Sequence, residues 1–96
     1  MPKAHKTHAN RNKTTTNFKK AQSHITRIQK MLDEDAYCID VMQQNLAVIG
    51  LLKSAHQMLM EDHLHACFEN AMRSGDSSKK AKMIEEILTV TKLLNK

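Results

Sequence analysis

Three residues of this sequence carry the clearest capacity for chemistry: Cys38, His63 and Cys67. His63 and Cys67 are four residues apart, which on a helix places both on one face, where they can chelate a single ion. Two thiolates with one imidazole suit Cu(I) in a site of low coordination number. Structural zinc usually takes a fourth protein ligand, and Ni(II) or Co(II) prefer more nitrogen and oxygen. The donor set therefore predicts a metal site in which ligand type favours copper.

The position of Cys38 predicts that this site is shared between two chains. At 1.5 Å per residue, a continuous helix would put Cys38 about 37 Å from His63, so the three ligands cannot meet within one chain. In an antiparallel pair of chains, a two-fold axis near residues 51 and 52 brings Cys38 of one chain opposite His63 and Cys67 of the other. The dimer then has two equivalent sites. Cys38 also falls near the start of its helix, where the helix dipole favours the thiolate.

Other readings of the same residues stay open. The cysteines can be two buried thiols that align by chance with a surface histidine. His5 and His8 near the N-terminus could also reach a metal and make the site richer in nitrogen. His65 points to a different side of the helix from His63 and is expected at the surface.

The elements that must position these residues are all helical. The chain has one Pro and two Gly, which disfavours a turn-rich β fold. Apolar residues recur at steps of three and four, predicting helices over about 16–33, 36–73 and 78–95 after a flexible basic arm at 1–14. The expected helix caps are one of residues 14–17, then Asp35, and the segment Asp76-Ser77-Ser78 after a stop at Gly75. In the first helix one apolar stripe comprises Phe18, Ala21, Ile25, Ile28 and Leu32.

Length and helix geometry predict one domain over residues 1–96 that assembles with copies of itself. The central helix, of about 37 residues, is too long for two shorter helices of a 96-residue chain to cover. We expect an antiparallel dimer in which the first two helices of each chain make a four-helix bundle. The longest stretch without charge, residues 41–52, is too short to span a membrane. Polar residues follow the basic N-terminus, so no secretory signal is indicated and the cytoplasm is the expected compartment.

The net charge of +5 is concentrated at one end of the chain. Residues 1–30 carry eight basic side chains and no acid, whereas residues 31–78 have a net charge of −6. Such a distribution indicates a polyanionic partner, and nucleic acid is favoured over a membrane because the basic arm at residues 1–14 has no apolar interfacial face. The alternative is a solvated tail. The expected DNA-binding residues are Lys19, Lys20, Arg27, Lys30 and Lys53, with Arg11 and Lys13 adding attraction to phosphates.

At these positions the sequence resembles a known family, the copper-sensing CsoR repressors of the CsoR/RcnR/FrmR superfamily. The resemblance runs from Asn17 onward and is strongest over residues 31–42, MLDEDAYCIDVM. It continues at the family spacing through Asp62-His63-Leu64, Cys67-Phe68 and Ile84-Glu85-Glu86-Ile87. The branches of the family differ at the metal positions, and the Cys, His, Cys set of this chain is similar to that of the copper branch.

The resemblance implies an all-α homotetramer, a dimer of dimers without a helix-turn-helix reader. It implies binding to double-stranded operator DNA when metal-free, release when one Cu(I) per chain binds, and derepression of copper efflux or resistance genes. Tyr37 and Glu86 match a Tyr and a Glu that hydrogen-bond near the ligating histidine. The chain departs from the family where DNA is contacted: relatives often carry Arg at the position of Asn17 or near Gln22, and a basic residue at that of Ser54.

The resemblance and the residues leave several alternatives. A nickel/cobalt-responsive or a formaldehyde- or persulfide-responsive repressor of the same family is one, and a copper buffer without DNA binding is another. An enzyme is disfavoured because the sequence has no Gly-rich phosphate loop and no nucleophile with a paired base and orienting group. Cys67 beside His63 is the one arrangement that resembles a thiol catalytic pair.

Overall fold

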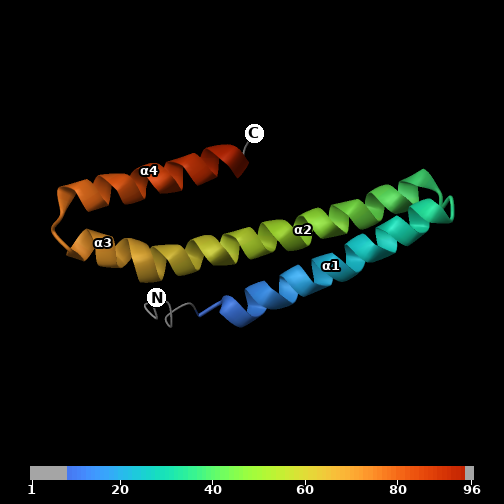
Figure 1. Cartoon of the computed structure of the whole chain (residues 1–96), viewed down its shortest axis with the longest axis horizontal. Helices are drawn as coiled ribbons and strands as arrows, with labels where there is room; N and C mark the ends of the chain where they lie inside the picture. The colour runs from blue at the N-terminus through green and yellow to red at the C-terminus, as the bar shows by residue number, and fades with distance from the viewer. Residues whose placement is uncertain (1–8, 95–96) are drawn as a thin grey trace. The chain divides into compact units, whose positions relative to one another are not determined.

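The computed structural model describes residues 9–94, and every regular element in this range is helical (Figure 1). The elements are α1 (Arg11–Asp33), α2 (Cys38–Asp62), the π-helical turn η2 (His63–Phe68), α3 (Glu69–Arg73) and α4 (Ser77–Leu94). The all-α prediction is confirmed. Residues 9–61 form one compact unit, and the elements from Asp62 onward belong to a second. No helix in residues 9–94 is long and apolar enough to cross a membrane.

The first unit is an antiparallel hairpin of α1 and α2, which lie side by side (Figure 1). Three hydrogen bonds join the helices along their length. The Asn10 amide donates to Glu61 Oε1 (2.9 Å), the Asn17 amide donates to the Leu51 carbonyl (3.3 Å), and His24 Nδ1 lies 3.2 Å from Gln44 Oε1. Because the partners run in opposite directions along the two helices, these bonds fix the register of the hairpin.

Between the helices lies a seam of residues spaced alternately by three and four, as in a coiled coil. The buried apolar members are Ala21, Val48 and Ala55, of which Ala55 is 0% exposed. Small side chains at these positions let the two backbones approach closely. The seam residues of α1 are 14, 17, 21, 24, 28 and 31, and those of α2 are 41, 44, 48, 51, 55 and 58; all are buried or half-buried.

The apolar stripe expected on α1 therefore does not coincide with the face that packs on α2. Ala21 and Ile28 belong to the seam, whereas Phe18, Ile25 and Leu32 are exposed. The reason is that Asn17 and His24, polar residues that the stripe left out, have hydrogen-bond partners on α2 and so occupy seam positions. The exposed apolar residues of α1 form a second line, seven residues apart.

Helix α1 begins five residues earlier than expected, at Arg11, so residues 11–14 are helical and not part of an arm. The threonines do not cap the helix. The hydroxyls of Thr14, Thr15 and Thr16 each donate to the backbone carbonyl four residues earlier. A threonine hydroxyl can be satisfied in this way inside a helix, and a sequence pattern cannot distinguish this from capping. His5 and His8 lie outside the described residues.

Asp35 ends α1 and does not cap α2. It has a left-handed backbone conformation, with φ of 57°. The Asp35 amide donates to the Leu32 carbonyl and the Ala36 amide to the Met31 carbonyl, the two bonds of a Schellman motif. Asp is one of the few side chains that tolerate this conformation. Helix α2 consequently starts at Cys38, two residues later than expected.

The stop at Gly75 has the geometry expected from the sequence. Gly75 has φ of 76°, a left-handed conformation that favours glycine. The Asp76 carboxylate then accepts the backbone N–H groups of Ser78 (3.0 Å) and Lys79 (3.2 Å), which caps α4.

Candidate metal centre and DNA-binding residues

His63 and Cys67, two of the three expected metal ligands, lie in the π-helical turn η2. The Glu69 amide, at the end of this turn, donates to the Leu64 carbonyl five residues earlier. A π turn holds more residues than the 3.6 of an α-helix, so residues four apart lie more nearly in line along the axis. The turn therefore suits His63 and Cys67 to bind one ion from the same side. The sequence carried no signal for it.

The surroundings of these two ligands are partly shielded from solvent. His63 and Cys67 are half-buried, and Asp62 and Ala66 between and beside them are buried. His65 is exposed, as expected, and its Nδ1 lies 3.5 Å from Glu69 Oε2. Of the two histidines in η2, His63 is half-buried and His65 is exposed. His63 is also the histidine that lies four residues before Cys67.

Cys38, the third expected ligand, is the first residue of α2 and is exposed. Its neighbour Tyr37 is more exposed still, at 69%. Both cysteines of the chain are thiols. Among residues 9–94, no three His, Cys, Asp or Glu side chains come close enough to hold one metal ion. His63 and Cys67 thus share one turn directly after α2, and Cys38 is the first residue of that helix.

Glu86 lies in the middle of α4 and is exposed. It lines a shallow recess of about 440 Å³ on that helix together with Glu85, Thr89 and Val90. Of the residues expected to support the metal site, Tyr37 lies in the connection just before α2 and Glu86 on α4, and both side chains are exposed.

The expected DNA-binding residues are all exposed, and most lie on α1. This helix has no acidic residue before its last position, Asp33. Lys13, Lys20 and Arg27 are seven residues apart and so form one row beside the seam. Arg11, Lys19 and Lys30 extend the charge around the helix, and Lys53 is on α2. Within the described part of the first 30 residues, the structure thus gathers the basic side chains along one helix of the hairpin.

Comparison with known proteins places this arrangement in a family. The model of a family described as metal-sensitive transcriptional repressors matches residues 10–93. The chain belongs to this family. Such repressors regulate transcription and are not enzymes, which agrees with the absence of catalytic motifs in the sequence.

Several curated members of the repressor family are similar to this chain. The copper-sensing transcriptional repressor CsoR of Bacillus subtilis is 34% identical over 92 residues, covering 96% of this chain and 88% of the relative. CsoR of Mycobacterium tuberculosis is 36% identical over 75 residues, and RicR of the same species is 30% identical over 77. The match spans 78% of this chain and 60% of the mycobacterial CsoR. No solved structure matches the chain.

Proposed function

We propose that this metal-sensitive repressor is a cytoplasmic copper sensor that binds operator DNA when metal-free and releases it when Cu(I) binds, which derepresses copper efflux or resistance genes. The observation that carries the proposal is the donor set of Cys38, His63 and Cys67, with the last two in one π turn. Two thiolates and an imidazole suit Cu(I) better than zinc, nickel or cobalt. The relatives named as copper sensors support the same metal.

Each Cu(I) is held, in this proposal, between two chains of an antiparallel dimer. Helix α2 has 25 residues and is about 37 Å long, with Cys38 at its first position and His63 just beyond its last. Two copies of α2 that cross in opposite directions bring the start of each helix to the end of the other. One Cu(I) per chain then has all three ligands, although no single chain supplies them together.

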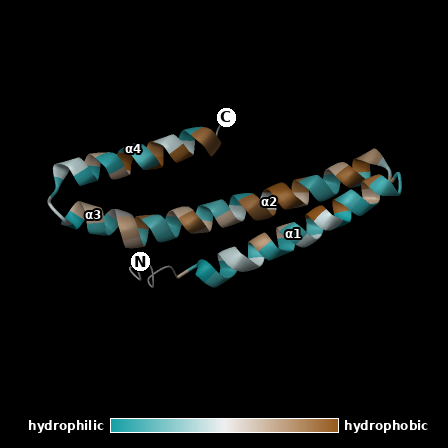
Figure 2. Ribbon diagram, viewed as in Figure 1, coloured by the Kyte–Doolittle hydropathy of each residue, from teal (hydrophilic) through white to brown (hydrophobic). Residues whose placement is uncertain are grey.

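The apolar surface of the hairpin supports such a dimer. Large apolar side chains on both helices are exposed, and the hydrophobic positions are visible along α2 in Figure 2. Burying one such Leu, Ile or Phe side chain stabilises an assembly by about 1.5–3 kcal/mol. Pairing two hairpins buries many of them at once. The residues concerned are Phe18, Ile25, Leu32, Ile39, Met42, Leu46, Ile49, Leu52 and Leu59.

A dimer of dimers with double-stranded DNA as its partner completes the proposed assembly, and all 96 residues act as one metal-sensing, DNA-binding domain. The DNA-facing residues are Arg11, Lys13, Lys19, Lys20, Arg27, Lys30 and Lys53. The ammonium and guanidinium groups of α1 neutralise phosphates and release counterions, which contributes affinity without reading sequence.

Metal binding is coupled to DNA release through the second nitrogen of the His63 ring. Ligation by one nitrogen fixes the tautomer and orientation of the imidazole, so the other nitrogen donates to a nearby acceptor. Glu86, and the hydroxyl of Tyr37, are the groups proposed to accept or extend that hydrogen bond. The Glu86→Ala variant should then bind Cu(I) tightly but respond to it with weaker DNA release. Full copper-driven release by this variant would exclude the coupling role of Glu86.

An anaerobic titration of the reduced protein tests the metal. Cu(I) is added against a competing chelator, with Zn(II) and Ni(II) in parallel, and fluorescence anisotropy follows release of DNA taken from upstream of the encoding gene. We expect one tight Cu(I) per chain, lost in Cys67→Ala, and loss of DNA binding as the site fills. Tighter Ni(II) than Cu(I) would assign the chain to the nickel/cobalt branch. Tight Cu(I) with no DNA binding would indicate a copper buffer, and no metal binding would indicate a sensor of formaldehyde or persulfide.

A further inference from the structure

Helix α2 has a second line of residues with coiled-coil spacing, next to the seam that packs on α1. The residues of this line alternate in steps of three and four and are 42, 45, 49, 52, 56 and 59. Each follows a seam residue by one position, so the line lies about 100° further around the helix. Its apolar members Met42, Ile49, Leu52 and Leu59 are exposed. We call it the uncovered line of α2, because α1 does not bury it.

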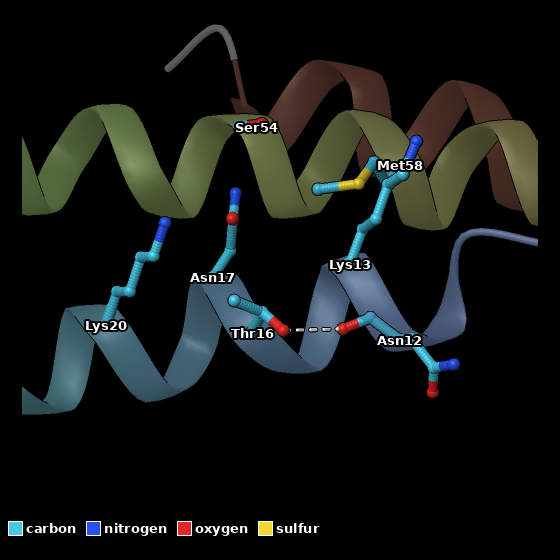
Figure 3. Close-up of a pocket in the computed structure, with 7 residues that line it drawn as sticks. All are labelled: Asn12, Lys13, Thr16, Asn17, Lys20, Ser54 and Met58. Atoms are coloured by element: carbon cyan, nitrogen blue, oxygen red, sulfur yellow. Dashed lines mark hydrogen bonds between the residues drawn. The ribbon is translucent and has the colours of Figure 1, made fainter.

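The two flanks of the seam differ in what they face. On one flank, Ser54 of α2 shares a recess of about 460 Å³ with Lys13 and Lys20, which extend from α1 toward α2 (Figure 3). Ser54 comes one position before the buried Ala55, and His56 comes one position after it. Ser54 and His56 therefore lie on opposite flanks of the seam. The hairpin fills the first flank and leaves the flank of the uncovered line available to another chain.

Two members of the uncovered line are polar, Asn45 and His56. The Asn45 side chain is exposed and that of His56 is half-buried. Neither has a hydrogen-bond or ion-pair partner among the described residues. The Asn amide carries both a donor and an acceptor, and so does a neutral imidazole, so the two groups can pair in either histidine tautomer. Within one chain they are roughly 16 Å apart along the helix, too far to meet.

The apolar members of the uncovered line are arranged symmetrically about the peptide bond between residues 50 and 51. Ile49 and Leu52 lie at equal distances from this point in the sequence, and so do Met42 and Leu59. Two copies of α2 that pair in opposite directions about this point therefore place Ile49 opposite Leu52 of the partner subunit. Met42 likewise lies opposite Leu59 of the partner subunit. An antiparallel pair thus matches apolar with apolar side chains.

The polar residues and the candidate metal ligands follow the same symmetry. Asn45 and His56 are equally far from the peptide bond between residues 50 and 51, and so are Cys38 and His63. One axis therefore places Asn45 opposite His56 of the partner subunit and Cys38 opposite His63 of the partner subunit. This axis is close to the one near residues 51 and 52 that the three ligands require.

We propose that Asn45 of each chain hydrogen-bonds to His56 of the partner subunit, and that the two bonds set the register in which Cys38 meets His63 of the partner subunit. The inference rests on the antiparallel dimer of the proposed function and names the contact that aligns it. Asn45 and His56 are then positioning residues, which hold the two chains in register and do not bind the metal themselves.

Other registers of the antiparallel pair leave these polar groups unmatched. A shift of one heptad in one direction places Asn45 opposite Ile49 of the partner subunit, and a shift in the other direction places His56 opposite Leu52 of the partner subunit. A polar group held against an apolar side chain loses its hydrogen bonds to water without replacement. Single polar residues in coiled-coil seams select one register for this reason.

A double-mutant cycle on the metal-free, full-length protein tests the contact. Asn45→Leu and His56→Leu are made singly and together, and dissociation of the dimer is followed by sedimentation velocity over a range of protein concentrations. Substitutions this far apart on one helix have additive effects unless the two residues meet across the interface. The control cycle uses Gln43→Leu and Gln57→Leu, at exposed positions of α2 outside both lines.

We expect each single variant to weaken the dimer about tenfold or more, because it leaves a polar group against an apolar side chain. The double variant should dimerise more tightly than either single variant, since Leu then lies opposite Leu. The control cycle should be additive. Additive effects of Asn45→Leu and His56→Leu would overturn the proposal, even where the wild type binds Cu(I) and releases DNA.

Cu(I) affinity tests the positioning role at protein concentrations where every variant is dimeric. Asn45→His/His56→Asn exchanges the two residues, keeps one amide opposite one imidazole and should retain wild-type affinity. Asn45→Leu should bind Cu(I) about fivefold more weakly or worse. Equal affinity of Asn45→Leu and the wild type would overturn the positioning role. A wild type that binds neither Cu(I) nor a DNA duplex would contradict the repressor function instead, and a non-additive cycle would still support the contact.

Discussion

Mixing two inactive variants gives a direct test of the metal site shared between chains. Cys38→Ala keeps His63 and Cys67, and Cys67→Ala keeps Cys38, so each variant alone lacks one ligand in every site of its homodimer. In a dimer of unlike chains, one site collects both substitutions and the other has all three natural ligands. The complete site combines Cys38 of the Cys67→Ala chain with His63 and Cys67 of the Cys38→Ala chain.

The expected recovery follows from the symmetry of the pairing. Random pairing of equal amounts makes about half of the dimers mixed, and each mixed dimer has one complete site. The mixture should therefore bind about one quarter of a Cu(I) per chain with wild-type affinity, against one for the wild type and none for either variant alone. The geometric premise is the length of α2, about 37 Å over 25 residues, which separates Cys38 from His63 within a chain.

The assay is an anaerobic chelator competition after the two reduced chains are denatured together and refolded. A mixture of His63→Ala with Cys67→Ala is the matched control, because both substitutions fall on the same segment and no pairing of these chains completes a site. Recovery in the first mixture alone supports the shared site. No recovery in either mixture would refute the antiparallel arrangement, since a site within one chain cannot be rescued by a partner.

Three further predictions concern the hairpin and the caps that position the ligands. Asp76→Ala removes the carboxylate that accepts two backbone N–H groups at the start of α4 and should lower the unfolding free energy by about 1 kcal/mol in urea titrations; an unchanged midpoint would mean that the cap contributes nothing. Asp35→Val places a β-branched side chain at a residue with φ of 57° and should lower the unfolding free energy by roughly 1–2 kcal/mol, whereas Asp35→Gly should not destabilise the protein. Both variants are compared with the wild type in thermal melts. Equal losses of stability in the two variants would contradict the Schellman assignment. Ala55→Leu overfills the buried seam and should cost about 1–3 kcal/mol, whereas Ala47→Leu, at an exposed position of the same helix, is the control; similar melting temperatures for both would show that Ala55 is not confined by α1.

The sequence was sufficient to predict the helical class and the stop at Gly75, because these depend on local chemistry. A glycine followed by an aspartate has few alternatives when the chain must adopt a left-handed conformation and then restart a helix. Asp35 was harder, since an aspartate serves equally well as the first cap of one helix or the last left-handed residue of another. Only the hydrogen bonds from Asp35 and Ala36 back to α1 distinguish the two.

The contents of the seam and the π turn could not be predicted from periodicity. The apolar stripe of α1 included Phe18, Ile25 and Leu32 among the residues expected to pack. Asn17 and His24 instead lie on the side that faces α2, because each has a hydrogen-bond partner on that helix. The residue pattern of one helix does not show which of its side chains have hydrogen-bond partners on another helix. The π turn depends on i to i+5 bonds, for which neither composition nor spacing gives a signal. The candidate ligands were predicted as a set, but the local geometry of His63 and Cys67 was not.

The three hydrogen bonds across the hairpin have a mechanical consequence for α1. Asn10, Asn17 and His24 each meet a different partner on α2, so a slide of one helical turn would break all three bonds at once. These bonds therefore hold α1 in one register on α2, and the row of Lys13, Lys20 and Arg27 is fixed with it. Seven residues of α-helix rise about 10 Å, which fixes the interval between successive charges. A polyanion that contacts all three basic side chains must therefore offer negative charges spaced at multiples of about 10 Å.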